Sequence, residues 1–116
     1  MKKAAFVFLL PALILVAILA HEEDKTFSGD IMDRQCAALG GHESMMNDDR
    51  NTPRACTLAC VQFAGMFVLY DATASKTYPL DDQKKPEPLA GEKVTVTGTY
   101  DDSTQTIHVT NIVAAN

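Results

Sequence analysis

The spacing of apolar residues changes from helical to strand-like at Gly65. Between Thr52 and Gly65, apolar residues and cysteines recur every three or four positions, which is the spacing of a helix with one buried face. Thr52 can cap this helix, Pro53 suits its first turn, and Gly65 can end it in a left-handed conformation. Short alternating stretches occupy much of the remaining chain, and alternation is typical of half-buried strands.

Five segments have the alternation or the β-branched and aromatic content of strands. These segments are 26–33, 66–70, 76–80, 91–100 and 106–113. A long loop (34–51) without regular spacing separates the first strand from the helix. In the last strand we expect Ile107 and Val109 to face the core and His108 to face solvent. The element order is β-α-β-β-β-β, and such a chain can hide its sheet edges by curling into a small barrel.

The first twenty residues have the parts of a bacterial export signal. Lys2 and Lys3 give a positive start, the next seventeen residues carry no charge, and Ala20 offers a small residue for cleavage. The charged residues that follow cannot continue an apolar helix into lipid. We therefore expect a cleaved signal peptide at 1–20 and a periplasmic or secreted domain at 21–116. An uncleaved membrane anchor is the alternative, and it would be the only contact with a membrane.

Cleavage leaves 96 residues, which is enough for one domain and too few for two. The removed segment carries two lysines and no acidic residue, so the formal net charge changes from −5 to −7. An acidic domain without clustered Lys and Arg is repelled by phosphate backbones, which argues against nucleic acid as a partner. The sequence has no phosphate loop, nucleophile elbow or His-Glu-x-x-His motif, and we expect no enzymatic activity. The expected partner is an envelope protein or a small ligand.

Three cysteines and one histidine within 34–65 form the most distinctive group of residues. Cys36 and His42 lie in the long loop, and the helix places Cys56 and Cys60 four residues apart on one face. In an oxidising compartment two nearby thiols normally pair. A disulfide between Cys36 and Cys56 would fasten the loop to the helix and stabilise the domain by about 3 kcal/mol. Because a helix N-terminus lowers the pKa of a thiol, we expect Cys56 to be more reactive than Cys60, which would remain a buried thiol.

A metal site is the alternative interpretation of the same residues. The three cysteine sulfurs and the imidazole nitrogen of His42 would satisfy tetrahedral Zn²⁺. The thiolates also suit Cu(I), and the thioethers of Met45 and Met46 are close in sequence. A redox-active thiol pair is a third interpretation. The residues therefore leave a choice between a disulfide-stapled module without a cofactor and a Zn- or Cu-binding protein.

Several short motifs along the mature chain contain these cysteines and the glycines of the predicted strands. They are Gly29-x-Ile31-x-Asp33-x-x-Cys36, His42 with Met45, Cys56-Thr57-Leu58-Ala59-Cys60-Val61, Tyr78-x-Leu80-Asp81, Gly91-x-x-Val94-x-Val96-x-Gly98 and Thr106-Ile107-His108-Val109. Together they resemble an uncharacterised family of small secreted bacterial proteins. The resemblance covers nearly the whole mature chain and implies a small five-stranded OB-like barrel, closed or half-open. In most OB barrels the helix lies between the third and fourth strands, whereas here it follows the first.

Overall fold

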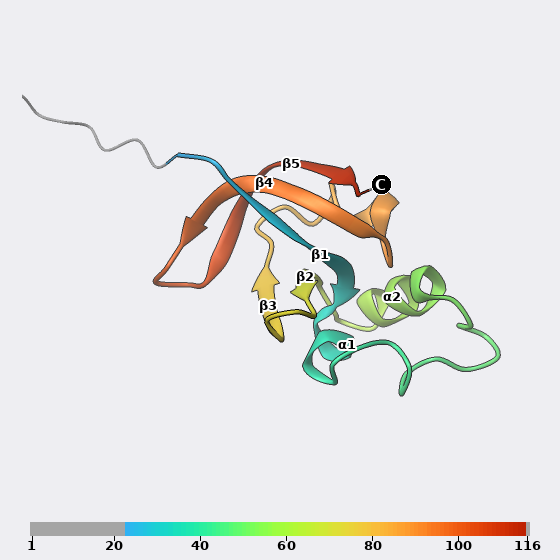
Figure 1. The fold of residues 1–116 in the computed structure, drawn as a ribbon. Coiled ribbons are helices and arrows are strands. Elements are labelled where there is room, and N and C mark those ends of the chain that lie inside the picture. The colour runs from blue at the N-terminus through green and yellow to red at the C-terminus, as the bar shows by residue number, and fades with distance from the viewer. Residues whose placement is uncertain (1–22, 116) are drawn as a thin grey trace, which may run out of the picture.

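The computed structural model describes residues 23–115, and the predicted signal peptide at 1–20 lies outside this range. The described chain forms five strands, two α-helices and one 3-10 turn (Figure 1). The strands are β1 (Lys25–Asp33), β2 (Phe67–Asp71), β3 (Lys76–Pro79), β4 (Lys93–Asp101) and β5 (Thr106–Ala114). The helices are α1 (Arg34–Ala38) and α2 (Pro53–Gln62), and the 3-10 turn η1 spans Glu87–Leu89. Within this part of the chain, no helix has the length and apolar character needed to span a membrane.

All five strands belong to one antiparallel sheet with the order β3-β2-β1-β4-β5. The central strand β1 pairs with β4 along its first part and with β2 along its last residues. A register shift between Thr97 and Gly98 interrupts the pairing of β4 with β5, and such a bulge bends and twists a strand. The predicted mainly β architecture is confirmed. Continuous strand pairing does not close the sheet, so the structure shows a curved sheet and not a closed barrel.

One face of the curved sheet carries the main hydrophobic core. Its buried members are Ile31, Phe67, Leu69, Leu80, Ala90, Val94, Val96, Ile107 and Ile112. Leu58 and Val61 of α2 pack against this group, which fixes the helix on the sheet. The expected alternation in the last strand is present, because Ile107 is buried, Val109 is half-buried and His108 is exposed. Burying each large aliphatic side chain contributes about 1.5–3 kcal/mol, so this face supplies most of the driving force for folding.

The end of α2 differs from the prediction. The helix ends at Gln62, and Ala64 takes the left-handed conformation, with a φ of 60°. Gly65 was expected to take that conformation, and this expectation is wrong. Glycine is required there by close packing, since a Cβ at Gly65 would collide with the carboxylate of Asp33 and the carbonyl oxygen of Cys60.

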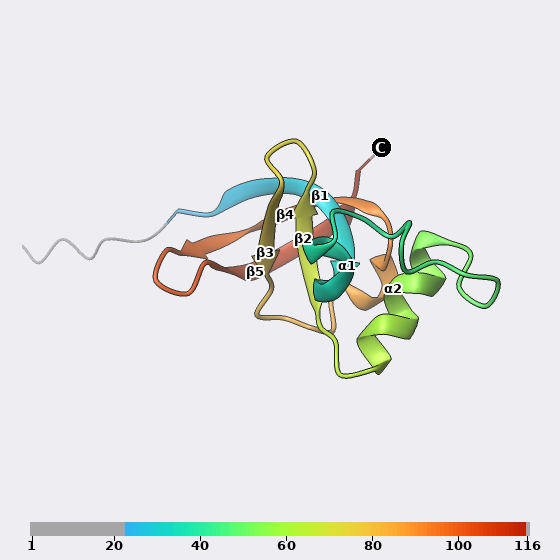
Figure 2. The ribbon, with the colours of Figure 1, turned by 90° about the horizontal axis from the view of Figure 1, so that it is seen from below.

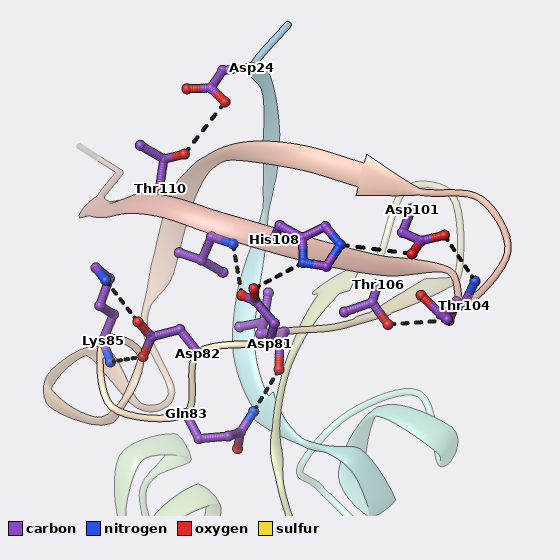
Figure 3. Close-up of polar contacts among 12 residues, drawn as sticks. Asp24, Asp81, Asp82, Gln83, Lys85, Asp101, Thr104, Thr106, His108 and Thr110 are labelled. Carbon is purple, nitrogen blue, oxygen red and sulfur yellow. Dashed lines mark hydrogen bonds and ion pairs between the residues drawn. The ribbon is translucent and has the colours of Figure 1, made fainter. Parts of the chain in front are cut away.

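A short seam joins the end of β3 to β5. Leu80 and Ile107 form an isolated parallel bridge, and the N–H of Asp81 donates to the carbonyl of Ile107 at 3.1 Å. The carboxylate of Asp81 accepts the backbone N–H of Val109 at 2.8 Å and lies 3.0 Å from Nδ1 of His108 (Figure 3). The seam therefore holds the two edge strands together through one backbone bridge and the side chain of Asp81, not through a continuous ladder.

The imidazole of His108 lies between two carboxylates on the surface of the sheet. Nδ1 is 3.0 Å from Asp81 and Nε2 is 3.8 Å from Asp101. The hydrogen bond with Asp81 is the main cause that raises the pKa of His108 above its usual value. Partial burial opposes ionisation of Asp81, but its hydrogen bonds to Val109 and His108 hold the pKa of its carboxyl below the usual range. Folding therefore favours the charged form of both partners.

We expect the stabilising effect of His108 to depend on pH. Because folding raises the pKa of His108, its contribution is complete below the unfolded value of about 6.5 and is lost as pH rises through the folded pKa. His108→Gln should lower the Tm at pH 5.5, where Asp81 is still ionised, and should have little effect at pH 9. Thermal unfolding followed by circular dichroism measures this. Thr110→Ala, which changes an exposed residue on the same strand, is the control and should shift the Tm equally at both pH values. An equal shift at both pH values in His108→Gln would contradict the expectation.

Candidate metal centre

Two helices carry the three cysteines and lie together at one end of the sheet (Figure 2). Helix α1 follows β1 directly, and the carboxylate of Asp33 caps it by accepting the N–H of Gln35 at 2.8 Å. Helix α2 starts as predicted, because the hydroxyl of Thr52 accepts the N–H of Ala55 at 3.0 Å. In both cases a side-chain oxygen satisfies an N–H group that has no partner inside the helix. The start of α2 follows the sequence prediction, whereas α1 lies at the start of the segment that was predicted as a loop.

The buried carboxylate of Asp33 also connects the end of α2 to the start of α1. Its second oxygen accepts the N–H of Met66 at 3.2 Å, and the N–H of Arg34 donates to the carbonyl of Met66 at 3.0 Å. Gly65 lets the chain pass close to this carboxylate. As a result, the segment leaving α2 is held against the segment entering α1, and the facing sides of the two helices are fixed relative to each other.

The sulfur atoms of Cys36, Cys56 and Cys60 converge between these helices. All three lie within 4.8 Å of one another, and the sulfurs of Cys36 and Cys60 are 3.9 Å apart. Cys36 and Cys56 are fully buried, whereas Cys60 is 6% exposed. All three are free thiols, since a disulfide requires about 2.05 Å between sulfurs. The predicted disulfide between Cys36 and Cys56 is thus not formed in this structure, and it stays a prediction.

The loop between α1 and α2 covers this sulfur cluster, which consists of Cys36, Cys56 and Cys60. The half-buried side chains of Met45 and Met46 pack against it. Nη1 of Arg50 lies 3.7 Å from the sulfur of Cys60. The loop therefore brings two thioether side chains and one permanent positive charge to the cluster.

Burial favours the neutral, protonated form of Cys36 and Cys56. Burial, together with the neighbouring Cys60 and Cys56, raises the pKa of Cys36 to about 12. Burial also raises the pKa of Cys56, although a hydrogen bond with Cys36 and the charge of Arg50 oppose this effect. Three thiolates so close together in a low-dielectric site repel one another strongly. The site therefore favours three negative sulfurs only when they share a cation.

The expected order of thiol reactivity stays a prediction, but the burial of Cys56 acts against it. Cys56 was expected to react faster than Cys60 because it lies nearer the helix N-terminus. Cys56 has no exposed surface and a raised pKa, whereas Cys60 is 6% exposed. Burial is the main cause of the raised pKa of Cys56, and it acts against the lowering expected at a helix N-terminus.

His42 is not among the converging ligand atoms. Within residues 23–115, the group of atoms that lie within 4.8 Å of one another contains only the three cysteine sulfurs. His42 lines a separate cleft of 510 Å³ with Leu39 and Pro53. Burial lowers the pKa of His42 despite the opposing charge of Asp30, and its buried Nδ1 has no hydrogen-bond partner in the described chain. The structure thus brings together three of the four predicted ligands, and a ligand role for His42 stays a prediction.

The sequence analysis did not identify Arg50 as part of the site. Arg50 lies in a polar run whose composition is typical of a turn. The structure has this turn, because the side chain of Asn47 accepts the N–H groups of Asp49 and Arg50. Nothing in the local pattern indicates that the guanidinium folds back onto Cys60. Only the packing of the loop on the cluster produces this contact.

Comparisons with known proteins supply no further assignment. The sequence matches no protein family model, and no curated protein or solved structure is significantly similar to it. The resemblance to an uncharacterised secreted family therefore stays a prediction. The function has to be argued from the chemistry of the sulfur cluster.

We expect Asp33→Ala to loosen the cluster as well as the fold. Loss of a helix cap costs about 0.5–2 kcal/mol, and the partly buried N–H of Met66 loses its partner, so urea unfolding should show a loss of about 2–4 kcal/mol. Because Asp33 also positions α1, Cys36 should react faster with a thiol reagent under native conditions. Asp82→Ala, which removes an exposed turn contact, should cost less than about 1 kcal/mol and leave thiol reactivity unchanged. Unchanged reactivity in Asp33→Ala would contradict this role.

Proposed function

We propose that this protein binds one soft metal ion, Cu(I) in preference to Zn²⁺, through the thiolates of Cys36, Cys56 and Cys60. The convergence of three buried sulfurs within 4.8 Å carries the proposal. Sulfurs that share one metal at about 2.3 Å lie roughly 4 Å apart. The 3.9 Å between Cys36 and Cys60 already has this spacing, so binding requires little movement of the chain.

The type and number of donors favour Cu(I). Structural Zn²⁺ takes four protein ligands, whereas three ligand atoms converge in the described chain. Thiolates and thioethers select soft ions such as Cu(I), and the thioethers of Met45 and Met46 pack against the sulfurs. Three thiolates around Cu(I) leave an excess of negative charge. The guanidinium of Arg50, 3.7 Å from Cys60, offsets part of this excess.

The wider setting of the proposal is an exported, non-enzymatic binding module of the cell envelope. The export-signal pattern at 1–20 and the absence of catalytic motifs from the sequence support it. An OB-like barrel is the proposed form of the sheet, supported by the strand order and by the bridge between Leu80 and Ile107. The position of α2 after β1 departs from the usual OB arrangement. In this proposal the barrel is the support on which the cysteine-bearing helices are mounted.

The disulfide-stapled module is the second candidate, and the close approach of Cys36 and Cys60 favours it. A disulfide would require their sulfurs to move from 3.9 Å to about 2.05 Å apart. A disulfide between Cys36 and either helix cysteine leaves one free thiol and removes the three-thiolate site. The two candidates therefore differ in the number of free thiols and in metal content.

Anaerobic titration with Cu(I), in competition with a coloured Cu(I) chelator, tests the proposal. We expect one Cu(I) per chain, and at least 100-fold weaker binding when any one of the three cysteines is changed to Ser. Because binding must displace the proton of Cys36, whose pKa is about 12, the apparent affinity should rise at least tenfold per pH unit between about pH 6 and 8. His42→Ala is the matched control and should keep the affinity within threefold.

Three outcomes would contradict this assignment. Protein purified without reductant that has one free thiol after denaturation, and that binds no Cu(I), would be the stapled module. A loss in His42→Ala as large as the loss in the cysteine variants would favour the four-ligand Zn²⁺ site. An affinity that does not change with pH would show that the buried thiols are not the ligands.

A further inference from the structure

A cleft of 500 Å³ opens between the start of α1 and the end of α2, and Cys60 lies in its wall. Arg34 and Gln35 line the side formed by α1, and Phe63 lines the side formed by α2. Of the three cysteines in the sulfur cluster, Cys60 is the one with exposed surface. The cleft is therefore the part of the described surface that we consider for access to the cluster.

The charges near Cys60 are positive although the chain is acidic. Arg50 lies 3.7 Å from its sulfur, and Arg34 lines the cleft, where its Nη1 contacts the thioether of Met66 at 3.9 Å. Neither guanidinium forms an ion pair within residues 23–115. The carboxylate that lines the cleft, Asp33, is buried and accepts two backbone N–H groups. Arg50 does not line the cleft itself, so two guanidiniums, one in the lining and one beside Cys60, stand against one buried carboxylate. In a chain with a formal net charge of −5, this leaves a local excess of positive charge near Cys60.

The size and the rim of the cleft suit a short peptide. Small-molecule sites commonly occupy about 300–1,000 Å³, and the 500 Å³ of this cleft lies within that range. Phe63 is 85% exposed at the rim and offers an aromatic surface on which a peptide backbone can lie. The charge near Cys60, the size of the cleft and the aromatic ring at its rim together indicate a small anionic ligand that approaches the thiol of Cys60.

We propose that this cleft binds a small anionic thiol, a short cysteine-containing peptide with free carboxylates, which exchanges the metal ion with the sulfur cluster. The exchange rests on the proposed function. The carboxylates pair with Arg34 and Arg50, and the incoming sulfur forms a bond to Cu(I). The bond between Cu(I) and Cys60 then breaks, and Cys60 takes up the proton that the incoming thiol has released. Cu(I) keeps its oxidation state, so no oxidant or reductant is needed.

The charge selectivity of the cleft can be measured without metal. Iodoacetate and iodoacetamide alkylate the same sulfur but differ in charge, so the ratio of their rates at one pH reports the local potential. At Cys60, identified by peptide mapping, this ratio should be at least threefold higher than for N-acetylcysteinamide. Arg34→Gln and Arg50→Gln should each lower it at least twofold, and 0.5 M salt should remove the excess. Arg54→Gln, a change in an arginine that instead bonds the carbonyl of Pro88, should leave the ratio unchanged.

Metal exchange is tested with two small thiols of opposite charge. Cu(I) supplied as its complex with glutathione, which is anionic, should reach the protein at least fivefold faster than Cu(I) supplied with cysteamine. Arg34→Gln should remove most of this preference, and Arg54→Gln should retain it. Cu(I) binding without any charge preference would overturn the cleft as the exchange site and leave the proposed function intact. A charge-selective Cys60 in a protein that binds no Cu(I) would overturn both the proposed function and the exchange role.

Discussion

The buried carboxylate of Asp33 is the contact on which the arrangement of the sulfur cluster depends. It ends the central strand β1, caps α1 through Gln35, and accepts the N–H of Met66 where the chain leaves α2. Gly65 permits this approach, because any side chain there would meet the carboxylate. One side chain therefore links the sheet to both helices. The facing surfaces of the helices, and with them the sulfurs, are held in place from the end of β1.

The chemistry of the cluster follows from its burial. A sulfur in a low-dielectric site keeps its proton, and the pKa of about 12 for Cys36 shows how strongly the neutral form is favoured. A bound cation reverses this preference, because it interacts with all three sulfurs at once. Arg50 contributes a permanent charge beside Cys60, which is 6% exposed, whereas the other two cysteines have no exposed surface. The cluster thus combines two fully buried cysteines with a third, Cys60, that lines a cleft.

Much of the fold was predictable because its signals are local. Alternation, or β-branched and aromatic content, located all five strands, and Thr52 with Pro53 located the start of α2. The site was predictable only in part, since Cys36 meets the helix cysteines through a loop without any regular pattern. The reversed exposure of Cys56 and Cys60, and the contact of Arg50 with the cluster, depend on how this loop packs. The sequence analysis also missed why residue 65 is glycine. Its close approach to the carboxylate of Asp33, which is distant in sequence, produces no local sequence pattern.

X-ray absorption at the copper edge, measured on the Cu(I)-loaded protein, tests the central claim most directly. The account predicts three sulfur neighbours at about 2.3 Å and no nitrogen or oxygen neighbour. In Cys60→Ser, the number of sulfur neighbours should fall by one. A spectrum with an imidazole neighbour, or with only two sulfurs in the unaltered protein, would contradict a site made by Cys36, Cys56 and Cys60.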